Sequence, residues 1–515
     1  MKTSLPLALL VFLHANTCAA VSSPPMPTVT SPFQEQTPAT LQPDFISRGY
    51  GMFIHFGINT FNETEWSYGK LPVESYKPTN LDVDQWIRVA KEAGFRHVVL
   101  TTKHVDGFCL WDSALTTYDV ASTPVKTDIV AEVAKACQRY GLKLGLYYSL
   151  WDAREPSQKN DMPRYVDYMK GQITELLTQY GPVCEFWFDA PWATPADSDW
   201  CYPELRELIR RLQPDCAVTV NHTILPPSLK RESLNPEHFA RGSVLRFWPV
   251  DFRTKDPNLV RWDDPKLYTA PDQSLVYLPF EHTVCISDLA NWFQKKAVRP
   301  ARSADELEAL FYWCTANDNV LLLNIPPDQT GQLRANEVEA ALAAADLLGI
   351  RGGHTPLPTA PENQAFGVKA EADSTAGPEN TAEMAVDTKL EGPAWLSAAT
   401  PVTLTLTPAT PFRFDRIVLH EHCTLQDLGD KFSFLREFAV EKFVVEAFRK
   451  GEWHVIHEGE KMGAVKTIRF APVQTAEQLR VRILEANRPA GLYHIEVSEF
   501  STRGTRPPAA TRITP

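Results

Sequence analysis

Short apolar runs alternate with amphipathic helical segments between residues 49 and 348. The apolar runs predict strands at Met52–Ile58, His97–Thr101, Lys143–Tyr148, Cys184–Asp189, Ala217–Val220, Val244–Trp248, Leu275–Leu278 and Val320–Asn324. The amphipathic segments predict helices at Val83–Ala93, Ile129–Tyr140, Pro163–Tyr180, Tyr202–Leu212, Ala304–Thr315 and Ala335–Leu347. Because repeated strand–helix units build a parallel sheet covered by helices, eight strands predict an α/β fold, a (β/α)8 barrel over residues 43–350.

The pattern changes after a join at 351–379 that is rich in Gly, Pro, Thr and Ala. Short and often alternating β-rich runs follow at Val402–Leu406, Arg416–Leu419, Ala439–Ala447, His454–His457, Lys466–Phe470, Leu479–Leu484 and Gly491–Phe500. They predict a β-sandwich over residues 380–502, similar to discoidin or carbohydrate-binding modules, and a disordered tail at 503–515. Binding sugar, capping the barrel and pairing subunits all stay open as its role.

The amino terminus carries a targeting pattern. Lys2 precedes the apolar run Leu5–Leu13, and small residues close the segment at Ala19 and Ala20. This order predicts a signal peptide over residues 1–20, followed by a flexible leader at 21–42 and a secreted or periplasmic protein. No later segment has the roughly 20 apolar residues of a membrane span, so we expect none.

The composition and the net charge limit the kinds of ligand that the protein is expected to bind. Apolar residues at 44% and charged residues at 22% are typical of a globular protein. The net charge of −12 gives no basic surface for nucleic acid, and a neutral ligand fits better. Nine cysteines show no metal-ligand spacing, and no motif for nucleotides, serine hydrolysis or zinc peptidases is present. We therefore expect no cofactor and no metal, while a homo-oligomer stays open.

Polar and aromatic residues gather where the predicted strands end. The set includes His55, Lys103, His104, Tyr148, Asp189, Asn221 and His222. Asp189 ends the run Cys184-Glu185-Phe186-Trp187-Phe188-Asp189, and an unpaired carboxylate in apolar surroundings is costly unless it has a function. Because carboxylates among aromatic rings suit the cleavage of sugar bonds, the pattern favours a glycoside hydrolase, which usually needs a second carboxyl group.

A series of segments follows one another along the predicted barrel: Gly51–Ile58, Glu65-Trp66, Asp84–Trp86, Ala90–Gly94, Thr102–Trp111, Gly145–Leu150, Trp187–Asp189 and Leu321–Asp328 with Gly331. Taken in this order, they resemble the α-L-fucosidases of glycoside hydrolase family 29. The resemblance implies an exo-acting, retaining enzyme that removes terminal α-L-fucosyl residues from an oligosaccharide or glycoconjugate. It also implies that Asp189 is the nucleophile. His55, Glu65, Trp66, His104, Tyr148 and Trp187 would then line the sugar site.

The resemblance leaves the acid/base residue open. Glu281 is our first choice, because its segment resembles the family's segment with a Glu some residues ahead of a Trp, here Trp292. Glu232 and Asp251 are the alternatives, since they follow the predicted fifth and sixth strands. The chain also departs from the family pattern at Val105, where a second His is usual, and at Ala190, where Gly is common. A related sugar such as an α-L-galactoside, and a carbohydrate-binding protein without catalysis, therefore remain alternatives.

Overall fold

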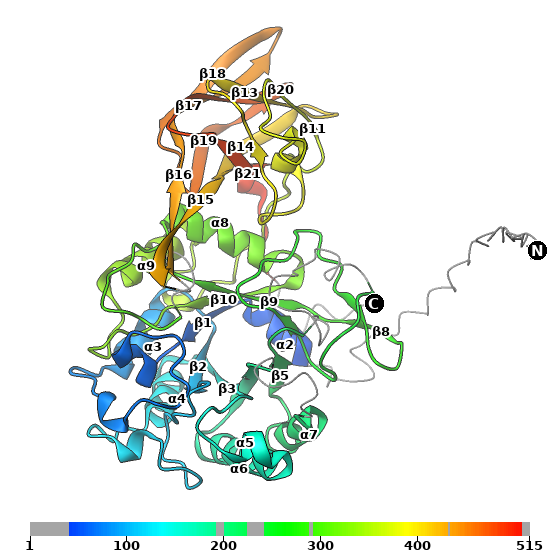
Figure 1. Ribbon diagram of the computed structural model, residues 1–515. Coiled ribbons are helices and arrows are strands. Elements are labelled where there is room, and N and C mark those ends of the chain that lie inside the picture. Colours follow the sequence, from blue (N-terminus) through cyan, green and yellow to red (C-terminus); the bar gives the residue numbers. More distant parts are fainter. Residues whose placement is uncertain (1–40, 192–199, 224–241, 288–291, 431–432, 507–515) are drawn as a thin grey trace, which may run out of the picture.

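The structure is a computed structural model that describes residues 41–191, 200–223, 242–287, 292–430 and 433–506 (Figure 1). A barrel and a β-sandwich each enclose a core of their own. The first core runs from Tyr50 to Leu357 and the second from Ala365 to Val497. The sandwich stands beside α8 (Ala304–Thr315) and α9 (Ala335–Leu348) of the barrel (Figure 1). The predicted fold class is confirmed.

Eight parallel strands within the described residues form the barrel sheet, in the order β5-β4-β3-β2-β1-β10-β9-β6. They are β1 (Tyr50–Ile54), β2 (His97–Lys103), β3 (Lys143–Ser149), β4 (Val183–Asp189), β5 (Ala217–Val220), β6 (Arg253–Thr254), β9 (Phe280–Cys285) and β10 (Val320–Asn324). The edge strands β5 and β6 approach each other where Asp251 N donates to Val218 O at 2.9 Å. The carboxyl ends of the strands therefore meet in one ring.

One of the eight predicted strands is wrong, and a second is a strand that lies outside the barrel sheet. The segment Val244–Trp248 forms only a single bridge, at Val244. Leu275–Leu278 contains β8 (Leu275–Tyr277), which pairs antiparallel with β7 (Leu267–Thr269) in a separate two-stranded sheet. The barrel sheet contains β6 and β9 in place of these two segments. The predicted number of eight barrel strands is therefore correct, but the two segments predicted for the sixth and seventh positions do not belong to the barrel.

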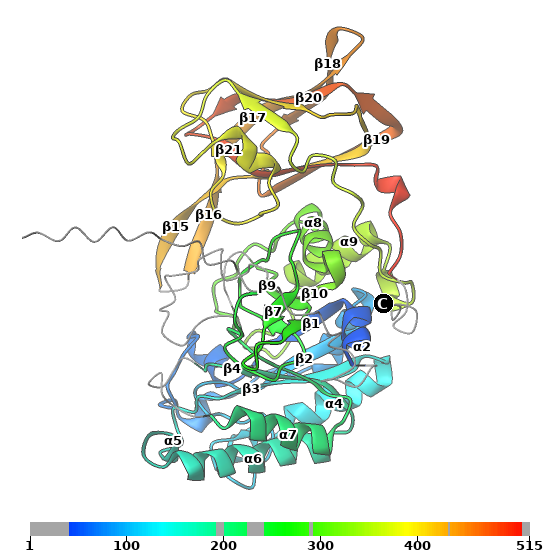
Figure 2. The ribbon, with the colours of Figure 1, turned by 90° about the vertical axis from the view of Figure 1, so that its right-hand side faces the viewer.

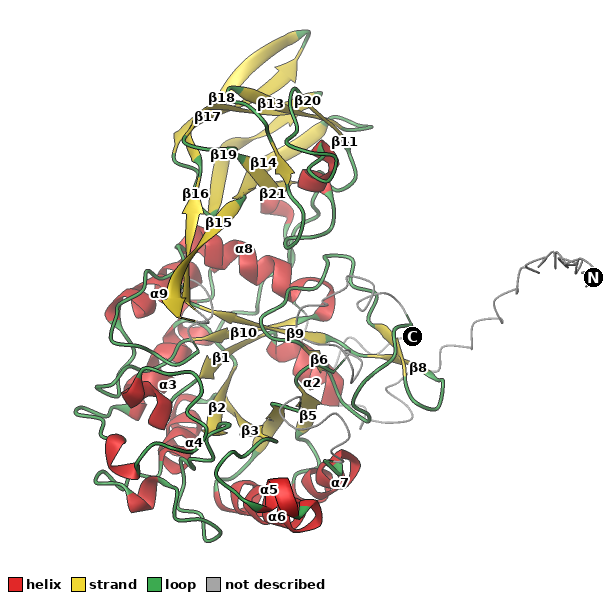
Figure 3. Ribbon diagram, in the orientation of Figure 1, coloured by secondary structure: helices red, strands yellow, loops and turns green. Residues whose placement is uncertain are grey.

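The predicted helices are confirmed to within two residues at each end. Besides α8 and α9 they are α3 (Val83–Glu92), α4 (Ile129–Tyr140), α6 (Met162–Gln179) and α7 (Tyr202–Leu212), which cover the outside of the barrel (Figure 3). Side chains of Asp82, Asp128, Asp161 and Ser303 cap the first turns of α3, α4, α6 and α8. Short 3-10 turns lie at Ile58–Asn62, Val73–Ser75, Val120–Ser122, Ala316–Asp318, Arg351–Gly353, Ala382–Val386 and Phe500–Thr502.

Two helices were not predicted, α2 (Leu41–Arg48) and the single turn α5 (Ser157–Asn160). The α2 helix closes the amino end of the barrel. Phe45 stacks on Phe252 at 4.2 Å between ring centroids, and Arg48 donates to Glu185 at 2.7 Å. This end is therefore filled by side chains, which leaves the carboxyl end for a functional site.

The sandwich consists of two antiparallel sheets. The first contains β11 (Lys369–Ala372), β13 (Val402–Thr407), β20 (Gln478–Ala486), β17 (Val440–Arg449) and β18 (Glu452–Glu460). The second contains β12 (Trp395–Leu396), β21 (Gly491–Ser498), β14 (Phe412–Glu421) and β19 (Val465–Ala476). All seven predicted runs overlap these strands to within two residues at each predicted end, and β13 alternates between buried and partly buried positions as a strand with one core face should.

Strand β11 lies inside the predicted join at 351–379 and pairs with β13, so the sandwich begins earlier than we expected. A hairpin of β15 (Cys423–Asp430) and β16 (Ser433–Phe438) was also not predicted. It leaves the sandwich and descends along the barrel, on the side opposite α2 (Figure 2).

The predicted signal peptide and the leader as far as residue 40 lie outside the described residues, as do residues 507–515 of the predicted tail. Within the described ranges, no helix combines the length and apolar character needed to cross a membrane.

Candidate active site

Asp189 is the last residue of β4, and its side chain is held from both sides. Tyr147 of β3 donates its hydroxyl to Asp189 Oδ2 at 2.6 Å. Asn221, which follows β5, donates its side-chain amide to Asp189 Oδ1 at 2.8 Å. Since Asp189 is 8% exposed, its carboxylate is fixed in place at the carboxyl end of the barrel and remains just accessible.

The surroundings of Asp189 set its charge. Burial and the nearby Asp256 carboxylate raise the pKa of Asp189, hydrogen bonds from Tyr147, Asn221 and the Ala190 amide lower it, and the resulting pKa is about 6. The carboxylate is thus ionised at neutral pH. Ala190 has φ 57, a left-handed conformation that favours glycine and costs a side chain about 1–2 kcal/mol.

Asp256 is a second carboxylate at this end of the barrel, and it was not predicted. It follows the two-residue strand β6, so no periodic pattern precedes it. The side chain of Asn221 donates to Asp256 Oδ1, and the Asp256 amide donates back to Asn221 Oδ1 at 3.2 Å. His222 Nε2 lies 3.9 Å from Asp256 Oδ1. Asn221 therefore links the two carboxylates.

Aromatic rings and neutral histidines form a wall next to Asp189. The His104 ring is nearly parallel to that of Tyr147, with 5.8 Å between centroids. Phe293 meets the rings of His55 and His104 edge-on at 5.4 and 5.0 Å, and Trp292 lies 5.1 Å from His55. Burial lowers the pKa of both histidines, that of His104 to about 3, so both are neutral and suited to binding hydroxyl groups.

Two more predicted residues join this wall. Glu65 Oε2 accepts the Phe293 amide at 3.2 Å, and the Trp66 ring lies perpendicular to His104 at 6.3 Å. Glu65, Trp66, His55 and His104 are thus brought together, as expected for one binding site. Phe293 was missed in the sequence because an isolated aromatic residue resembles any core residue.

Tyr148 does not reach the site. Its hydroxyl donates to Gln172 at 2.7 Å and accepts from Lys103 Nζ at 2.9 Å, on the side facing α6. Its neighbour Tyr147 faces the barrel interior, because successive residues of a strand point to opposite faces. The prediction that Tyr148 lines the sugar site is corrected to Tyr147.

Trp187 lies below the site rather than on its wall. It is 1% exposed, stacks on Tyr147 at 5.5 Å between centroids, and donates its indole N–H to Glu281 at 3.0 Å. Trp187 therefore supports Tyr147 from beneath, and the prediction of direct sugar contact is corrected.

Glu281 lies near the amino end of the barrel. It is the second residue of β9, is fully buried, and faces Trp187 and Glu185. Our prediction had a strand ending at Leu278 and Glu281 following it, whereas the strand begins only at Phe280. Glu281 is thus at the wrong end of its strand to meet a sugar above Asp189, and we withdraw it as the proton donor.

Asp251 is also withdrawn as a proton donor. Its Oδ1 accepts from Arg206 at 2.9 Å and Arg210 at 2.8 Å, and its Oδ2 accepts the Val218 amide at 2.7 Å. Asp251 is 1% exposed, so it forms buried ion pairs with α7 and a buried hydrogen bond with the backbone of β5, which is a structural role. The third candidate, Glu232, lies outside the described residues.

One group among the described residues could hold a metal ion, formed by His97, Glu185 and Glu281. His97 Nε2 lies 3.7 Å from Glu185 and 4.0 Å from Glu281. Arg48 donates to Glu185 at 2.7 Å and supplies positive charge there. The group is fully buried at the amino end of the barrel, where residues serve stability rather than catalysis.

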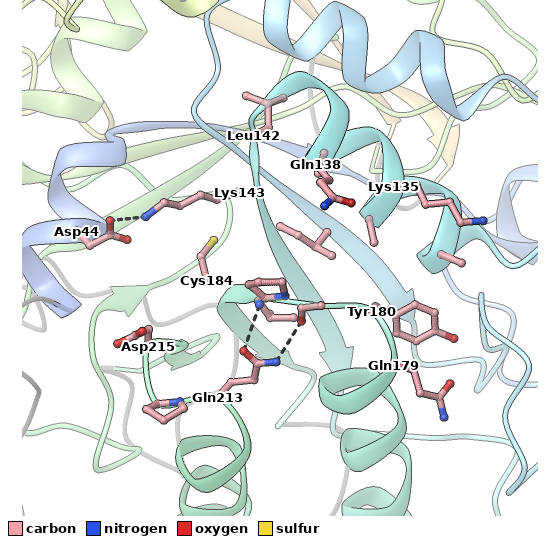
Figure 4. A pocket seen from close by; sticks show the side chains of 18 of the residues that line it. Asp44, Lys135, Gln138, Leu142, Lys143, Gln179, Tyr180, Cys184, Gln213 and Asp215 are labelled. Carbon is pink, nitrogen blue, oxygen red and sulfur yellow. Dashed lines mark hydrogen bonds and ion pairs between the residues drawn. The ribbon is translucent and has the colours of Figure 1, made fainter.

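A cavity of about 880 Å³ also lies at the amino ends of β3 and β4 (Figure 4). The ion pair of Lys143 with Asp44 lies at its edge, and Gln213 hydrogen-bonds backbone groups within it. Since Asp189 is at the other end of β4, this cavity is not part of the site described above.

A (β/α)8 barrel with a strand-end carboxylate among aromatic rings and neutral histidines defines the class of barrel glycosidases. Residues 59–353 match the profile of the family described as "Alpha-L-fucosidase". The chain belongs to the α-L-fucosidase family.

Similarity to individual proteins supports this family assignment. The chain is 32% identical over 334 residues to a protein named putative alpha-L-fucosidase 1 of Oryza sativa, covering 62% of this chain and 59% of that one. It is 30% identical to alpha-L-fucosidase 1 of Arabidopsis thaliana, covering 65% of each. It thus spans less than two thirds of the length of these relatives.

Solved structures show the same architecture. A crystal structure named putative alpha-L-fucosidase, from Bacteroides ovatus, superimposes with a TM-score of 0.51 at 26% identity. The superposition covers 91% of this chain and 74% of the other, and so includes the sandwich as well as the barrel.

Proposed function

We propose that the protein hydrolyses terminal α-L-fucosides with retention of configuration, using Asp189 as the nucleophile. The observation that carries the proposal is the carboxylate of Asp189, which Tyr147 and Asn221 hold in place next to the wall of rings and histidines. The family of the chain supports fucose as the sugar.

The geometry suits a two-step reaction. In the first step Asp189 attacks the anomeric carbon, the bond to the leaving oxygen breaks, and a proton donor protonates that oxygen. In the second step water, deprotonated by the same residue, attacks the glycosyl ester and releases Asp189. The hydrogen bonds from Tyr147 to Oδ2 and from Asn221 to Oδ1 orient the carboxylate of Asp189 for the attack.

We propose Glu232 as the proton donor. Glu281 and Asp251 are withdrawn for the reasons given above, and Glu232 lies in the connection between β5 and β6, two strands that border the site. Asp256 is the competing candidate, because it is linked to Asp189 through Asn221.

Azide distinguishes the nucleophile from the proton donor, because each variant forms a different anomer of fucosyl azide. In Asp189→Gly, hydrolysis of an aryl α-L-fucoside should fall by about four orders of magnitude, since the nucleophile is lost. Azide can take the place of the missing carboxylate, and the product should then be the inverted β-L-fucosyl azide. In Glu232→Ala the glycosyl ester still forms, so azide replaces water and the product should be α-L-fucosyl azide.

Asp256→Ala is the matched variant. If it yields the α-azide and Glu232→Ala does not, Asp256 is the proton donor instead. Wild-type levels of hydrolysis by Asp189→Gly would exclude Asp189 as the nucleophile. A wild type that hydrolyses no α-L-fucoside would refute the proposed activity itself.

We also propose that the protein is exported. The support is the order of Lys2, the apolar run Leu5–Leu13 and the small residues Ala19 and Ala20. Expression with its own amino terminus should yield a protein in the periplasm or medium that begins at Val21. A product that retains Met1 in the cytoplasm would contradict export.

A further inference from the structure

Glu281 makes a contact across the interior of the barrel. Its Oε1 accepts the indole N–H of Trp187 at 3.0 Å, although their strands β9 and β4 are not neighbours in the sheet. Among the described residues, this N–H has no other hydrogen-bond acceptor. Because a buried indole N–H needs an acceptor, Glu281 fixes the position of the Trp187 ring.

Trp187 belongs to a stack of three nearly parallel rings. Trp187 and Tyr147 are paired positions of β4 and β3, and their rings lie 5.5 Å apart between centroids with 19° between their planes. The His104 ring lies 5.8 Å from Tyr147, at 13°. Since His104 follows β2 directly, the stack runs from the barrel interior to the wall of the candidate active site.

Tyr147 connects this stack to the nucleophile. Its hydroxyl donates to Asp189 Oδ2 at 2.6 Å, and this hydrogen bond lowers the pKa of Asp189. Hydrogen bonds weaken steeply when their distance and angle depart from the ideal. A shift of the Tyr147 ring would therefore weaken the hydrogen bond and raise the pKa of Asp189.

The surroundings of Glu281 determine its charge. Glu185 and His97 lie beside it, and Arg48 donates to Glu185 at 2.7 Å. Burial, and after it the Glu185 carboxylate, raise the pKa of Glu281 well above its usual value, so Glu281 is neutral at pH 7. A neutral carboxyl group accepts with one oxygen and donates with the other, as a glutamine side chain does with its oxygen and nitrogen.

We propose that Glu281 is a positioning residue for the nucleophile. It holds the ring stack in place through Trp187, and the stack in turn fixes the hydrogen bond from Tyr147 to Asp189. The inference rests on the proposed function, in which Asp189 must be ionised to attack. It gives a buried acid of the barrel interior a role in the reaction without contact with the sugar.

The test compares two substitutions of Glu281. Glu281→Met removes the acceptor and keeps the length of the side chain, whereas Glu281→Gln keeps the acceptor. We expect Glu281→Met to lower kcat/KM for an aryl α-L-fucoside by about fivefold and to move the acid limb of its pH profile up by about half a unit. Glu281→Gln should stay within about twofold of wild type, with the acid limb in place.

The effect should depend on the Tyr147 hydroxyl. Tyr147→Phe lacks that hydroxyl, so adding Glu281→Met to it should move the acid limb no further. An equal further shift in this background would overturn the inference. So would an acid limb that Glu281→Met leaves in place, or one that Glu281→Gln moves as far.

Asp251→Asn is the control for lost stability. It also alters a buried acid of the barrel, but one outside the ring stack, and its acid limb should not move. A shift as large as that of Glu281→Met would show that lost stability alone moves the limb, and would overturn the inference. If Glu281→Met fails to fold, Trp187→Phe removes the same hydrogen bond from the donor side, and an unmoved limb in that variant would overturn the inference as well.

A direct titration of Asp189 separates this inference from the proposed function. Carbon NMR of the protein labelled at its aspartate carboxyl groups gives the pKa, and Asp189→Asn assigns the signal by its absence. Glu281→Met should raise the pKa of Asp189, and Glu281→Gln should not. A wild type that cleaves no fucoside would refute the proposed activity, whereas an unchanged pKa in Glu281→Met would overturn the positioning role alone.

Discussion

Tyr147 and Tyr148 are adjacent on β3 and have opposite roles, which makes them a matched pair for mutation. In Tyr147→Phe the hydrogen bond to Asp189 is lost, so the pKa of Asp189 should rise above about 6. We expect kcat/KM to fall by about tenfold or more, since a hydrogen bond to a charged group contributes about 1.5–3 kcal/mol. The acid side of the pH profile should move to higher pH.

Tyr148→Phe is the control for that prediction. It removes a hydroxyl that contacts only Lys103 and Gln172 among the hydrogen bonds described, away from Asp189. We expect a loss of stability of about 1–2 kcal/mol in urea unfolding and an unchanged pH profile. If Tyr148→Phe moves the acid limb and Tyr147→Phe does not, the assignment of the two faces is wrong.

Asp256 should tune the pH range of the enzyme. Its negative charge raises the pKa of Asp189, and Asp189 must be ionised to attack. Activity should therefore fall as the pH drops below about 6, and in Asp256→Asn this fall should begin at a lower pH. The measurement is kcat/KM against pH, which reports the free enzyme. An acid limb that stays in place in this variant would contradict the coupling of the two carboxylates.

At the level of single residues, the sequence was a good guide where a residue type is unusual for its setting. Asp189, His55 and His104 could be identified as site residues because burying a carboxylate or an imidazole at a strand end is unfavourable unless it has a partner or a function. Tyr147 could not be distinguished from Tyr148, since both are tyrosines and only strand direction separates them. Asp256 could not be identified from the sequence, because the strand before it is only two residues long and gives no periodic apolar pattern.

At the level of elements, Asp251 joins α7 to β5. Asp251→Asn should leave Arg206 and Arg210 without their anion, and we expect the free energy of unfolding to fall by about 3 kcal/mol. The folded enzyme should keep its kcat/KM, because this carboxylate does not face Asp189. Urea unfolding and fucoside hydrolysis check the two parts, with Glu207→Gln, an exposed position on α7, as the control. A loss of activity without a loss of stability would restore Asp251 as a catalytic candidate.

The regular strands and helices were predictable because their apolar residues face a core at a constant period. Strand β9 was missed because its second and fourth residues are Glu281 and Thr283. Glu281 Oε1 accepts the indole N–H of Trp187 inside the barrel, so a polar residue stands where an apolar pattern would need an apolar one. The apolar run at Leu275–Leu278 was more strand-like in the sequence, and it forms a strand of the outer pair β7–β8. Which segment joins the barrel sheet therefore depends on its pairing with neighbouring strands, and the local apolar pattern does not determine it.

At the level of the whole molecule, buried charges join the sandwich to the barrel. Glu308 of α8 is 1% exposed, forms an ion pair with Arg416 at 3.2 Å and accepts a hydrogen bond from Arg469 at 2.7 Å, and both arginines are on sandwich strands. Arg416 is itself 2% exposed. Because a buried arginine without its anion is strongly unfavourable, separating the two parts is costly, and they should unfold together.

Glu308→Gln tests that coupling. We expect the wild type to unfold in a single calorimetric transition, since neither part can expose these charges without disturbing the other. The variant leaves the buried Arg416 without its anion, while Arg469 keeps Asp305, so about 3 kcal/mol of interface stabilisation should be lost and two transitions should appear. Glu339→Gln, at an exposed position on α9, should melt like the wild type. Two separate transitions in the wild type would mean that the sandwich is only loosely attached.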